Sequence, residues 1–382
     1  MKLRAAHYRT GEVSEFTFGG AKLAERRTVR GRASLVYGPG FFDLQCNGYA
    51  GIDFNSPRLT PEQARFAISA MWQHGCTHVL PTVVTHQPER LEFLFRTLAL
   101  AIEDREIASS VPGFHLEGPF ISPVDGARGA HPLHAVRPVE TTLWQRLQRA
   151  SGKRIAVVTL APEVKGGVRF IGRLRSEEVL PAIGHTMAST EQVHAAADAG
   201  ALLSTHLGNG CPQLLPRHEN PIFAQLACDG LTASLIPDGI HLPGDVLKVM
   251  CRAKGLERIV AVTDAMSAAG APPGRYPLAD MEMEVGTDRV VRQPGSPNFA
   301  GSALTMDRAI SILVEKGGLS LADAWDAGSG QAWSVMRRAG GRVAASRPKS
   351  LVMADFQDGT LRICATLSGN KVLWMSRAAD GS

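Results

Sequence analysis

The chain has 382 residues and a mass of 40.9 kDa, with a net charge of +5, 44% apolar residues and 20% charged residues. This length allows one large α/β domain of about 250–300 residues and a smaller appendage, and the ordinary composition excludes disordered and fibrous proteins. No block of Lys and Arg with interleaved aromatic residues is present. We therefore expect no nucleic-acid partner and attribute the net charge to scattered surface arginines.

The six cysteines show neither CxxC spacing nor the density of a disulfide framework. The N-terminal segment lacks the apolar region of a signal peptide, and no run approaches the ~20 apolar residues of a membrane span. We expect a reduced, cytoplasmic protein that has no membrane partner.

In chain order, the first 38 residues lack the alternation of strands and helices that begins at about residue 41. Soon after that point, Thr60-Pro61-Glu62 predicts the start of a helix, with an N-cap, a proline at the first helical position and an acid in the first turn. Apolar residues at helical spacing follow, and Gly75 is predicted to end the helix.

Short apolar runs and amphipathic stretches then alternate. Strands are predicted at residues 77–81, 111–115 and 155–160, and further apolar runs end near Gly184, His206, Asp238 and Asp264. Helices are predicted at residues 89–102, 142–150, 191–199, 222–228, 245–253 and 306–316. Repeated alternation of this kind indicates a parallel sheet.

The tail of the chain differs again. Residues 350–356 and 360–366 resemble two short strands, and Asp358-Gly359 between them is typical of a hairpin turn. We expect residues 1–38 and 342–382 to form one small β domain, and residues 39–341 to form the main domain.

Polar residues stand at the ends of the apolar runs, one for each run: Gln45, Glu117, His185, His206, Asp238 and Asp264. Catalytic groups that converge from several strand ends are typical of a (β/α)8 TIM barrel. A doubly wound sheet usually gathers its site near one switch point. A barrel therefore explains polar residues at six strand ends better than a doubly wound sheet does.

Glu117, His185 and His206 supply one carboxylate and two imidazoles. Such a set leaves a tetrahedral divalent metal one position open for water and lowers the pKa of that water toward neutrality. Taken singly, Glu117 could be a structural acid paired with an arginine, and each histidine could be a satisfied core residue. Their shared placement at strand ends favours a metal-dependent hydrolase.

Asp264 ends the most strand-like run in the chain. One carboxylate can take the proton of a metal-bound water and later deliver it to a leaving nitrogen, although Asp is also a favoured helix N-cap. His241 could act as a neutral imidazole donor to a carbonyl, and Arg217 could recognise a phosphate or carboxylate. A solvated surface side chain is the alternative for either of these two residues.

Together these segments resemble the N-acetylglucosamine-6-phosphate deacetylases of the amidohydrolase superfamily. The resemblance covers about residues 38–310 and follows the family motifs in order, at residues 39–48, 115–120, 184–185, 205–207, 238–241, 262–265 and 301–306. It implies a (β/α)8 TIM barrel of amidohydrolase type with a small β domain formed by both chain ends.

The resemblance also implies a single metal ion. Many amidohydrolases carry His-x-His on the first barrel strand for a second metal, whereas this chain has Gln45-Cys46-Asn47, as do the deacetylases that it resembles. The implied ligands are Glu117, His185 and His206. The implied ion is Zn²⁺ first, with Fe²⁺ or another divalent ion as alternatives.

Carried over by position, Asp264 would be the general base and acid, and His241 would polarise the scissile carbonyl. The substrate-binding residues implied by the resemblance are Ala130, His131, Asn209, Gly210, Arg217, Asp238, His241, Phe299, Ala300 and Gly301. The family also implies a homodimer and a small-molecule N-acyl amino-sugar substrate.

The function implied is hydrolysis of N-acetylglucosamine 6-phosphate to glucosamine 6-phosphate and acetate, a step of amino-sugar metabolism. The family usually has an aromatic residue followed by Asn-Ala-Met-Pro after Thr-His-Leu, whereas this chain has Gly208-Asn209-Gly210-Cys211-Pro212. A different N-acyl amine, an unphosphorylated N-acyl sugar or a cyclic amide therefore stays open as substrate. A non-catalytic binding protein would need no positioned base, and a Rossmann-type dehydrogenase would need a GxGxxG after the first strand.

Overall fold

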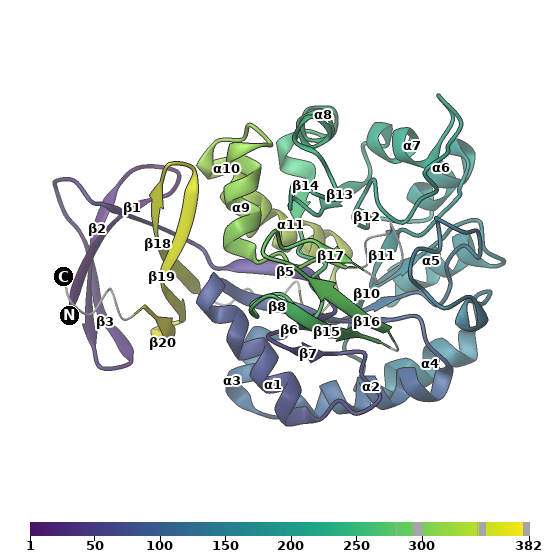
Figure 1. Cartoon of the computed structure of the whole chain (residues 1–382), viewed down its shortest axis with the longest axis horizontal. Coiled ribbons are helices and arrows are strands. Elements are labelled where there is room, and N and C mark those ends of the chain that lie inside the picture. The colour runs from purple at the N-terminus through teal and green to yellow at the C-terminus, as the bar shows by residue number, and fades with distance from the viewer. Residues whose placement is uncertain (280, 293–300, 342, 344–348, 377–382) are drawn as a thin grey trace.

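The computed structural model describes residues 1–279, 281–292, 301–341, 343 and 349–376 (Figure 1). Eight parallel strands form its main sheet, and each pairs with the next one along the chain. They are β5 (Phe41–Cys46), β8 (Cys76–Val84), β9 (Phe114–Glu117), β10 (Ile155–Leu160), β11 (Leu180–Ile183), β12 (Leu203–Ser204), β13 (Thr232–Leu235) and β14 (Ile259–Ala261). The predicted TIM-like (β/α)8 architecture is confirmed.

The first and last strands of this sheet meet in a different way. Within the described residues, β5 and β14 share no ladder of hydrogen bonds. They are joined just beyond the end of β14, where Asp264 N donates to Gln45 O at 2.9 Å and Asn47 N donates to Ala265 O at 2.7 Å. The seam of the barrel is therefore closed next to Asp264.

Helices cover the outer face of the sheet (Figure 1). They are α1 (Pro61–Ala70), α2 (Pro88–Ala101), α3 (Arg105–Ser110), α4 (Thr141–Ala150), α5 (Gly167–Ser176), α6 (Thr190–Asp198), α7 (Pro221–Ala227), α8 (Gly244–Lys254), α9 (Met306–Glu315), α10 (Leu321–Ala327) and α11 (Gly330–Ala339). Short 3-10 turns lie at η1 (Met71–His74), η2 (Leu133–Ala135) and η3 (Leu256–Arg258). The sequence analysis did not predict α3, α5, α10 or α11.

The first helix shows how local sequence sets an element. The Thr60 side chain accepts from Gln63 N at 3.3 Å, and the Gln63 side chain accepts from Thr60 N at 3.0 Å, which completes a capping box. The predicted helix is confirmed, but its last turn tightens into η1 before Gly75 ends it at φ 75°. A positive φ at this position suits glycine.

The main sheet is buried on both of its faces. Every residue of β5, β9, β11 and β13 is buried, because the strands pack against the barrel interior on one side and against helices on the other. This explains why parallel strands appear in the sequence as short continuous apolar runs.

Both ends of the chain form a second, closed β barrel, at the left of Figure 1. Its strands are β1 (Lys2–His7), β2 (Val13–Gly19), β3 (Lys22–Thr28), β4 (Leu35–Gly38), β18 (Ser350–Gln357), β19 (Thr360–Ser368) and β20 (Lys371–Met375). It has its own core around Phe16 and Met353. The predicted small β domain from both termini is confirmed, while residue 342, where its second segment was predicted to begin, lies outside the described residues.

The two barrels contact each other through Tyr8 and α10. The Tyr8 hydroxyl donates to Asp326 Oδ1 at 2.6 Å, and its ring lies 5.3 Å from that of Trp325. Trp325 Nε1 donates to Pro39 O at 2.8 Å, just before β5 begins. The small barrel is thus held against the first strand of the large one.

A further antiparallel sheet follows β14 and was not predicted. It consists of β15 (Gly274–Leu278), β16 (Met281–Val285) and β17 (Val291–Arg292). Its apolar face packs on Met266, Ala268 and Ala303, so it lies beside the segment that carries Asp264. A two-stranded antiparallel ribbon, β6 (Gly48–Tyr49) and β7 (Ile52–Asp53), follows β5 along the chain.

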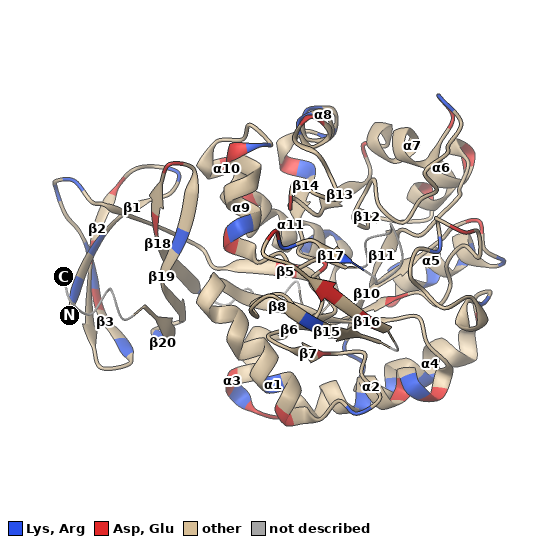
Figure 2. Ribbon diagram, viewed as in Figure 1, with Lys and Arg blue, Asp and Glu red and all other residues tan. Residues whose placement is uncertain are grey.

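Charged residues of both signs are interspersed over the outer helices (Figure 2). This distribution fits a modest net charge of +5 spread over the surface. Of the helices in the described ranges, none combines the length and the apolar character needed to cross a membrane.

Candidate active site

Three strand ends bring the predicted metal ligands together. Glu117 is the last residue of β9, and His185 and His206 each follow the end of a strand by two residues, β11 and β12 respectively. Directly after Glu117 the chain turns at Gly118, where a Cβ atom would stand 2.1 Å from Thr85 Oγ1. Only glycine fits that position. The order of the strands in the barrel makes the three residues neighbours.

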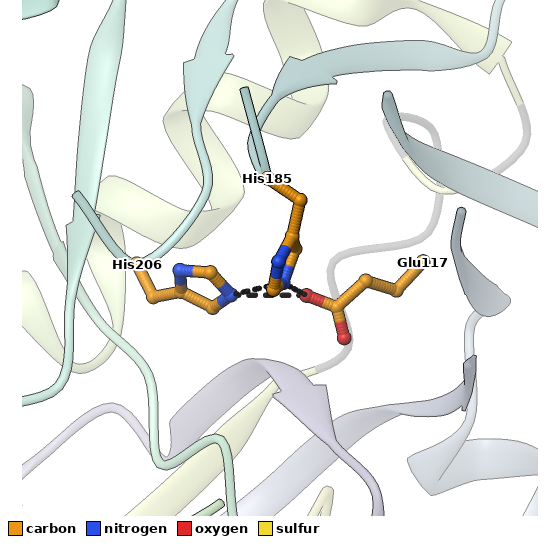
Figure 3. A group of neighbouring side chains, drawn as sticks. All are labelled: Glu117, His185 and His206. Carbon is orange, nitrogen blue, oxygen red and sulfur yellow. Dashed lines mark hydrogen bonds and ion pairs between the residues drawn. The ribbon is translucent and has the colours of Figure 1, made fainter. Parts of the chain in front are cut away.

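The three ligand atoms form a compact triangle (Figure 3). Glu117 Oε1 lies 3.2 Å from His185 Nε2 and 3.0 Å from His206 Nε2, and the two Nε2 atoms are 3.2 Å apart. All three residues are buried. Ligand atoms at tetrahedral zinc distances are separated by roughly 3.3 Å, so the triangle has the size that such an ion requires.

The protons in this group also suit a cation. His185 Nδ1 contacts Ala127 O at 2.9 Å, and because a carbonyl only accepts, the ring proton lies on Nδ1. In the neutral ring Nε2 then carries the lone pair that a metal ligand needs, whereas a hydrogen bond from Nε2 to Glu117 Oε1, 3.2 Å away, requires the imidazolium. Burial acts to raise the pKa of Glu117, but hydrogen bonds and charge from His185 and His206 bring that pKa well below its usual value. The donor set fits a divalent metal ion.

The backbone at the site is unusual. His185, His206 and Asp264 have φ values of 50°, 30° and 47°, a region that residues other than glycine rarely adopt and that clusters at functional sites. Glu163 holds the first of these turns, because its carboxylate accepts from Met187 N at 2.6 Å and from Thr186 Oγ1 at 2.5 Å.

His206 is held in a similar way by the next strand. Its backbone N–H donates to Ser234 Oγ at 2.8 Å, and Ser234 O accepts from Leu207 N at 2.9 Å. Since Ser234 belongs to β13, the strand that neighbours β12, each unusual turn is supported by a polar side chain from an adjacent part of the barrel.

Amide side chains from β5 and the residue just after it hold Asp264 beside the metal-ligand group. Gln45 Nε2 donates to Glu117 Oε1 at 2.9 Å and to Asp264 Oδ1 at 3.0 Å, and Asn47 Nδ2 donates to Asp264 Oδ1 at 2.7 Å. Burial, followed by the charge of Glu117, raises the pKa of Asp264 to about 6. A carboxylate with a pKa near neutrality is suited to accept and return a proton.

His131, which the resemblance predicts to be a substrate contact, lies against the same group. Its Nδ1 is 2.7 Å from Thr85 Oγ1, and its Nε2 is 3.2 Å from His185 Nε2. Burial, reinforced by His185, lowers the pKa of His131 well below its usual value. The imidazole is therefore neutral, and it offers a polar edge at the metal site.

His241 and Asp238 form a pair in the loop after β13. Asp238 Oδ1 accepts from Ile240 N and His241 N, each at 2.8 Å, and Asp238 Oδ2 is 2.6 Å from His241 Nδ1. Because an ionised carboxylate only accepts, the proton of this contact belongs to Nδ1. In the neutral ring Nε2 is then an acceptor, so His241 donates from Nε2 only as an imidazolium. The role of His241 as a donor to the carbonyl stays a prediction.

Among the remaining predicted substrate contacts, two lie close to the reacting groups. A Cβ atom at Gly210 would stand 2.9 Å from His185 Nδ1 and 3.2 Å from His206 Cε1. At Gly301 it would stand 3.5 Å from Asp264 O. Asn209 precedes Gly210 in the same turn, and its Nδ2 is buried without a partner in the described part of the chain.

The other predicted contacts are exposed or lie outside the described residues. Ala130 is exposed, next to His131. Arg217 is exposed in the loop before α7 and makes no hydrogen bond or ion pair with the described residues. Phe299 and Ala300 lie outside the described residues.

Sequence reasoning did not find several residues that support this site, among them Glu163, Ser234 and Thr85. Another is Asp43, a buried carboxylate on β5. A signal for Asp43 was present, since residues two apart on a strand face the same side and Asp43, Gln45 and Asn47 have that spacing.

No family model matches the chain, but several proteins of known activity are similar to it. It is 34% identical over 300 residues to N-acetylgalactosamine-6-phosphate deacetylase of Escherichia coli O157:H7, which covers 78% of this chain and 77% of that protein. It is also 34% identical over 307 residues to N-acetylglucosamine-6-phosphate deacetylase of Danio rerio, which covers 77% of this chain and 74% of that protein.

Solved structures agree in fold. N-acetyl-D-glucosamine-6-phosphate deacetylase of Mycobacterium smegmatis, as an Asp-to-Ala variant in complex with N-acetyl-D-glucosamine-6-phosphate, superposes with a TM-score of 0.84 at 26% identity, covering 98% of this chain and 99% of that one. N-acetylglucosamine-6-phosphate deacetylase of Thermotoga maritima gives a TM-score of 0.82 at 25% identity, with 98% and 100% covered. A 5-methylcytosine deaminase of Klebsiella pneumoniae, at 14% identity and a TM-score of 0.54, shares the fold alone.

Proposed function

The chain belongs to the N-acetylglucosamine-6-phosphate deacetylase family of the amidohydrolase superfamily, and we propose that it hydrolyses N-acetylglucosamine 6-phosphate to glucosamine 6-phosphate and acetate. The observation that carries this proposal is the triangle of Glu117, His185 and His206 with Asp264 held beside it by Gln45. A buried ligand triangle and a separate buried carboxylate are what metal-dependent amide hydrolysis requires.

Glu117, His185 and His206 would hold one divalent ion, and zinc suits a set of two imidazoles and one carboxylate best, with Fe²⁺ as an alternative. When bound, such an ion supplies a Lewis acid that makes water more acidic and polarises the amide carbonyl. Gln45 and Asn47 stand where a second pair of ligands would be needed. Both donate N–H groups to carboxylates, which supports a site with a single ion.

Asp264 would carry the proton through the reaction. It takes the proton of the water that attacks the acyl carbon, and it returns that proton to the nitrogen as the C–N bond breaks. A pKa raised to about 6 leaves this carboxylate ionised at neutral pH and yet able to hold a proton briefly. His241, oriented by Asp238, would polarise the carbonyl oxygen as negative charge develops there.

The substrate would lie between these groups and the loops that carry the remaining contacts. We assign the sugar to His131, Ala130, Asn209, Gly210, Phe299, Ala300 and Gly301, with Asp238 as the partner of His241. Arg217 would bind the phosphate, because a guanidinium matches phosphate geometry and no protein group in the described structure already pairs with it.

Three broader assignments belong to the same proposal. We assign the protein to the cytoplasm and to a homodimer, in line with the family that it resembles. We also treat residues 1–38 with 342–382 as one structural unit and 39–341 as the catalytic unit. Sedimentation analysis of the purified protein tests the dimer directly.

Acetate release from a small substrate panel tests the function. The purified protein should carry about one divalent ion per chain and release acetate from N-acetylglucosamine 6-phosphate. N-acetylgalactosamine 6-phosphate reports on the sugar epimer, since a relative is named for each sugar. Turnover of unphosphorylated N-acetylglucosamine at an equal rate, or metal without turnover of any phosphorylated N-acyl sugar, would contradict the assigned substrate.

Replacing Arg217 separates phosphate recognition from chemistry. Arg217→Ala should raise KM for the phosphorylated sugar and leave any slow hydrolysis of the unphosphorylated sugar as it was. Arg169→Ala, at another exposed position on the main domain, is the matched control. It should change neither the KM for the phosphorylated sugar nor the hydrolysis of the unphosphorylated sugar.

A further inference from the structure

A buried carboxylate closes the barrel next to the proposed proton carrier. Asp43 lies on β5 and is fully buried, at the seam where β5 and β14 share no ladder in the described structure. Its partners are Thr263, which immediately precedes Asp264, and the backbone of Gln45. No Lys or Arg side chain pairs with Asp43 within the described ranges.

The hydrogen bonds at this seam have a defined direction. Asp43 Oδ1 accepts from Thr263 N and from Gln45 N, each at 3.2 Å, and Asp43 Oδ2 accepts from the Thr263 hydroxyl at 2.5 Å. The hydroxyl has one proton to give, so its oxygen is left to accept from Ala265 N at 3.1 Å. Asp43 thus fixes Thr263 directly, and the Thr263 hydroxyl in turn holds Ala265 on the other side of Asp264.

Ser302 holds the segment of Thr263 and Asp264 from the other side. Ser302 Oγ donates to Thr263 O at 2.5 Å, and Ser302 N donates to Asp264 O at 3.0 Å. Asp264 N donates to Gln45 O. Between these contacts Asp264 has its φ of 47°, a conformation that persists only where surrounding contacts enforce it.

We propose that Asp43 is a positioning residue for Asp264, which acts through Thr263 to hold the proton carrier against Gln45 and Asn47. This inference rests on the proposed function, since it concerns the carboxylate assigned there as base and acid. Asp43 itself touches neither the metal ligands nor the space between them in any contact of the described residues.

The chemistry of the position argues against a purely packing role. Burying a carboxylate without a cation costs free energy, and burial raises the pKa of Asp43 to about 7. An apolar side chain would fill the same space without that cost. What an apolar side chain lacks is the pair of acceptors that Thr263 needs for its N–H and its hydroxyl.

Three variants test the proposal. In Asp43→Ala we expect kcat to fall about hundredfold, because displacing a reacting group by about 1 Å has an effect of that size, while KM and metal content stay unchanged. Thr263→Val, which keeps the volume but removes the hydroxyl, should have a similar effect. If both act through one contact, the double variant should lose no more than the worse single variant.

Asp43→Asn is the conservative variant and should restore most of the activity lost in Asp43→Ala. Its carbonyl oxygen keeps the two N–H partners, and its amide can donate to Thr263 Oγ1 while the hydroxyl turns to Gln45 O, which is 3.3 Å away. A residue that only filled space would not distinguish Asn from Ala in this way.

Glu15→Ala provides a control for loss of stability alone. Glu15 is a nearly buried carboxylate in the small barrel, paired with Arg27, so its loss should lower the melting temperature and leave kcat unchanged. The proposal is wrong if Asp43→Ala retains full kcat, or if it loses metal and substrate affinity together with kcat. Should Asp43→Ala fail to fold, Thr263→Val decides the question on the same criteria.

A crystal structure of Asp43→Ala provides a readout that does not depend on activity. We expect Asp264 to leave its positive φ and to lose its contacts with Gln45 and Asn47, and an unmoved Asp264 would overturn the inference. If the wild-type protein releases no acetate from any panel substrate, the proposed function fails by itself. The position of Asp264 in the variant then still tests the role of Asp43.

Discussion

Glu117 and Asp264 are two buried carboxylates whose surroundings move their pKa values in opposite directions. Two imidazoles bring the pKa of Glu117 well below its usual value against the effect of burial, whereas burial and the charge of Glu117 raise that of Asp264 to about 6. Separation of this kind lets two like residues take different roles. The first suits a permanent metal ligand and the second a group that gains and loses a proton.

Replacing Asp264 with Asn should abolish most of the activity without disturbing the site. Asn has the same shape, but it cannot take a proton, so we expect kcat to fall by about 10²–10⁴-fold, the usual contribution of a general acid–base group. Metal content, measured by elemental analysis, should be unchanged because Asp264 is not among the three proposed ligands.

The matched control is Asp358→Asn. Asp358 lies exposed in the turn between β18 and β19 with φ 49°, so it shares the backbone conformation of Asp264 and nothing of its surroundings. Acetate release should be the same as in the wild-type protein. Full activity in Asp264→Asn would exclude this residue as the proton carrier.

Glu163 supports the turn that follows the proposed metal ligand His185. Its carboxylate holds Thr186 and Met187, directly after His185. In Glu163→Gln one of these acceptors becomes a donor, and we expect metal affinity to fall by about 10–100-fold, as is usual when an outer support of a ligand is lost. Titration of the apoprotein with Zn²⁺ measures this directly.

A nearby glutamate serves as the comparison for Glu163. Glu191 lies exposed in the first turn of α6 and accepts from Ser189 Oγ at 2.7 Å. Glu191→Gln should bind Zn²⁺ as tightly as the wild-type protein does. Equal affinity in both variants would mean that the turn after β11 holds its shape without Glu163.

At the scale of elements, Lys254 links α8 to α7. Its side chain is buried, and Nζ donates to Gln225 O at 2.8 Å and to Cys228 O at 2.6 Å, at the carboxyl end of α7. A cation at this end also interacts favourably with the helix dipole. The contact gives Gln225 O a donor and adds a second donor to Cys228 O, which also accepts from Leu231 N at 3.1 Å.

Lys254→Met keeps the length of the side chain and removes these donors. Gln225 O would then lose the Nζ donor and Cys228 O would keep only Leu231 N, so the free energy of unfolding should fall by about 1–3 kcal/mol, as measured by urea denaturation. Lys248→Met on the same helix is the control, because Lys248 forms no hydrogen bond or ion pair with the described residues. It should leave the stability unchanged.

The difference in the free energy of unfolding between the wild-type protein and Lys254→Met should also depend on pH. Burial lowers the pKa of Lys254 from 10.5 to about 8, so between these values the unfolded wild-type chain binds more protons than the folded one. Stability then rises with pH across this window. The wild-type protein should gain stability relative to Lys254→Met between about pH 8 and pH 10, and a constant difference would contradict the assignment.

At the scale of the whole molecule, the proposed metal ion would be held by residues at the ends of β9, β11 and β12 and would join three parts of one barrel. Chelation should abolish acetate release and lower the melting temperature, because an ion that binds only the folded state stabilises it by about 4 kcal/mol at a thousandfold excess over its Kd. Adding Zn²⁺ should restore both. In Glu117→Gln the melting temperature should respond far less to chelator or Zn²⁺.

Much of the architecture could be predicted because parallel strands carry a simple signal. Buried strands appear as short apolar runs, and their carboxyl ends lie on one face of the barrel. Glu117, His185 and His206 could therefore be placed together before any contact was known. The small β domain followed from the hairpin at Asp358-Gly359, whose φ values of 49° and 77° suit that turn.

Other features left no comparable signal. The sheet of β15 to β17 packs on residues near Asp264 through contacts with Met266 and Ala303, which no local periodicity encodes. The direction of the His241–Asp238 contact depends on which ring nitrogen faces the carboxylate. That choice is made by the loop and not by the identity of the two residues.

The sequence by itself determined the residue types at the strand ends, the repeated alternation of strands and helices, and the replacement of His-x-His by Gln45 and Asn47. Only the tertiary structure decided that Asp43 meets Thr263, 220 positions away along the chain, and that Gln45 bridges Glu117 and Asp264. The reason is physical. Periodicity and turn chemistry act between near neighbours in the chain, whereas the closing of a barrel joins its first strand to its last and sets which polar groups share a hydrogen bond.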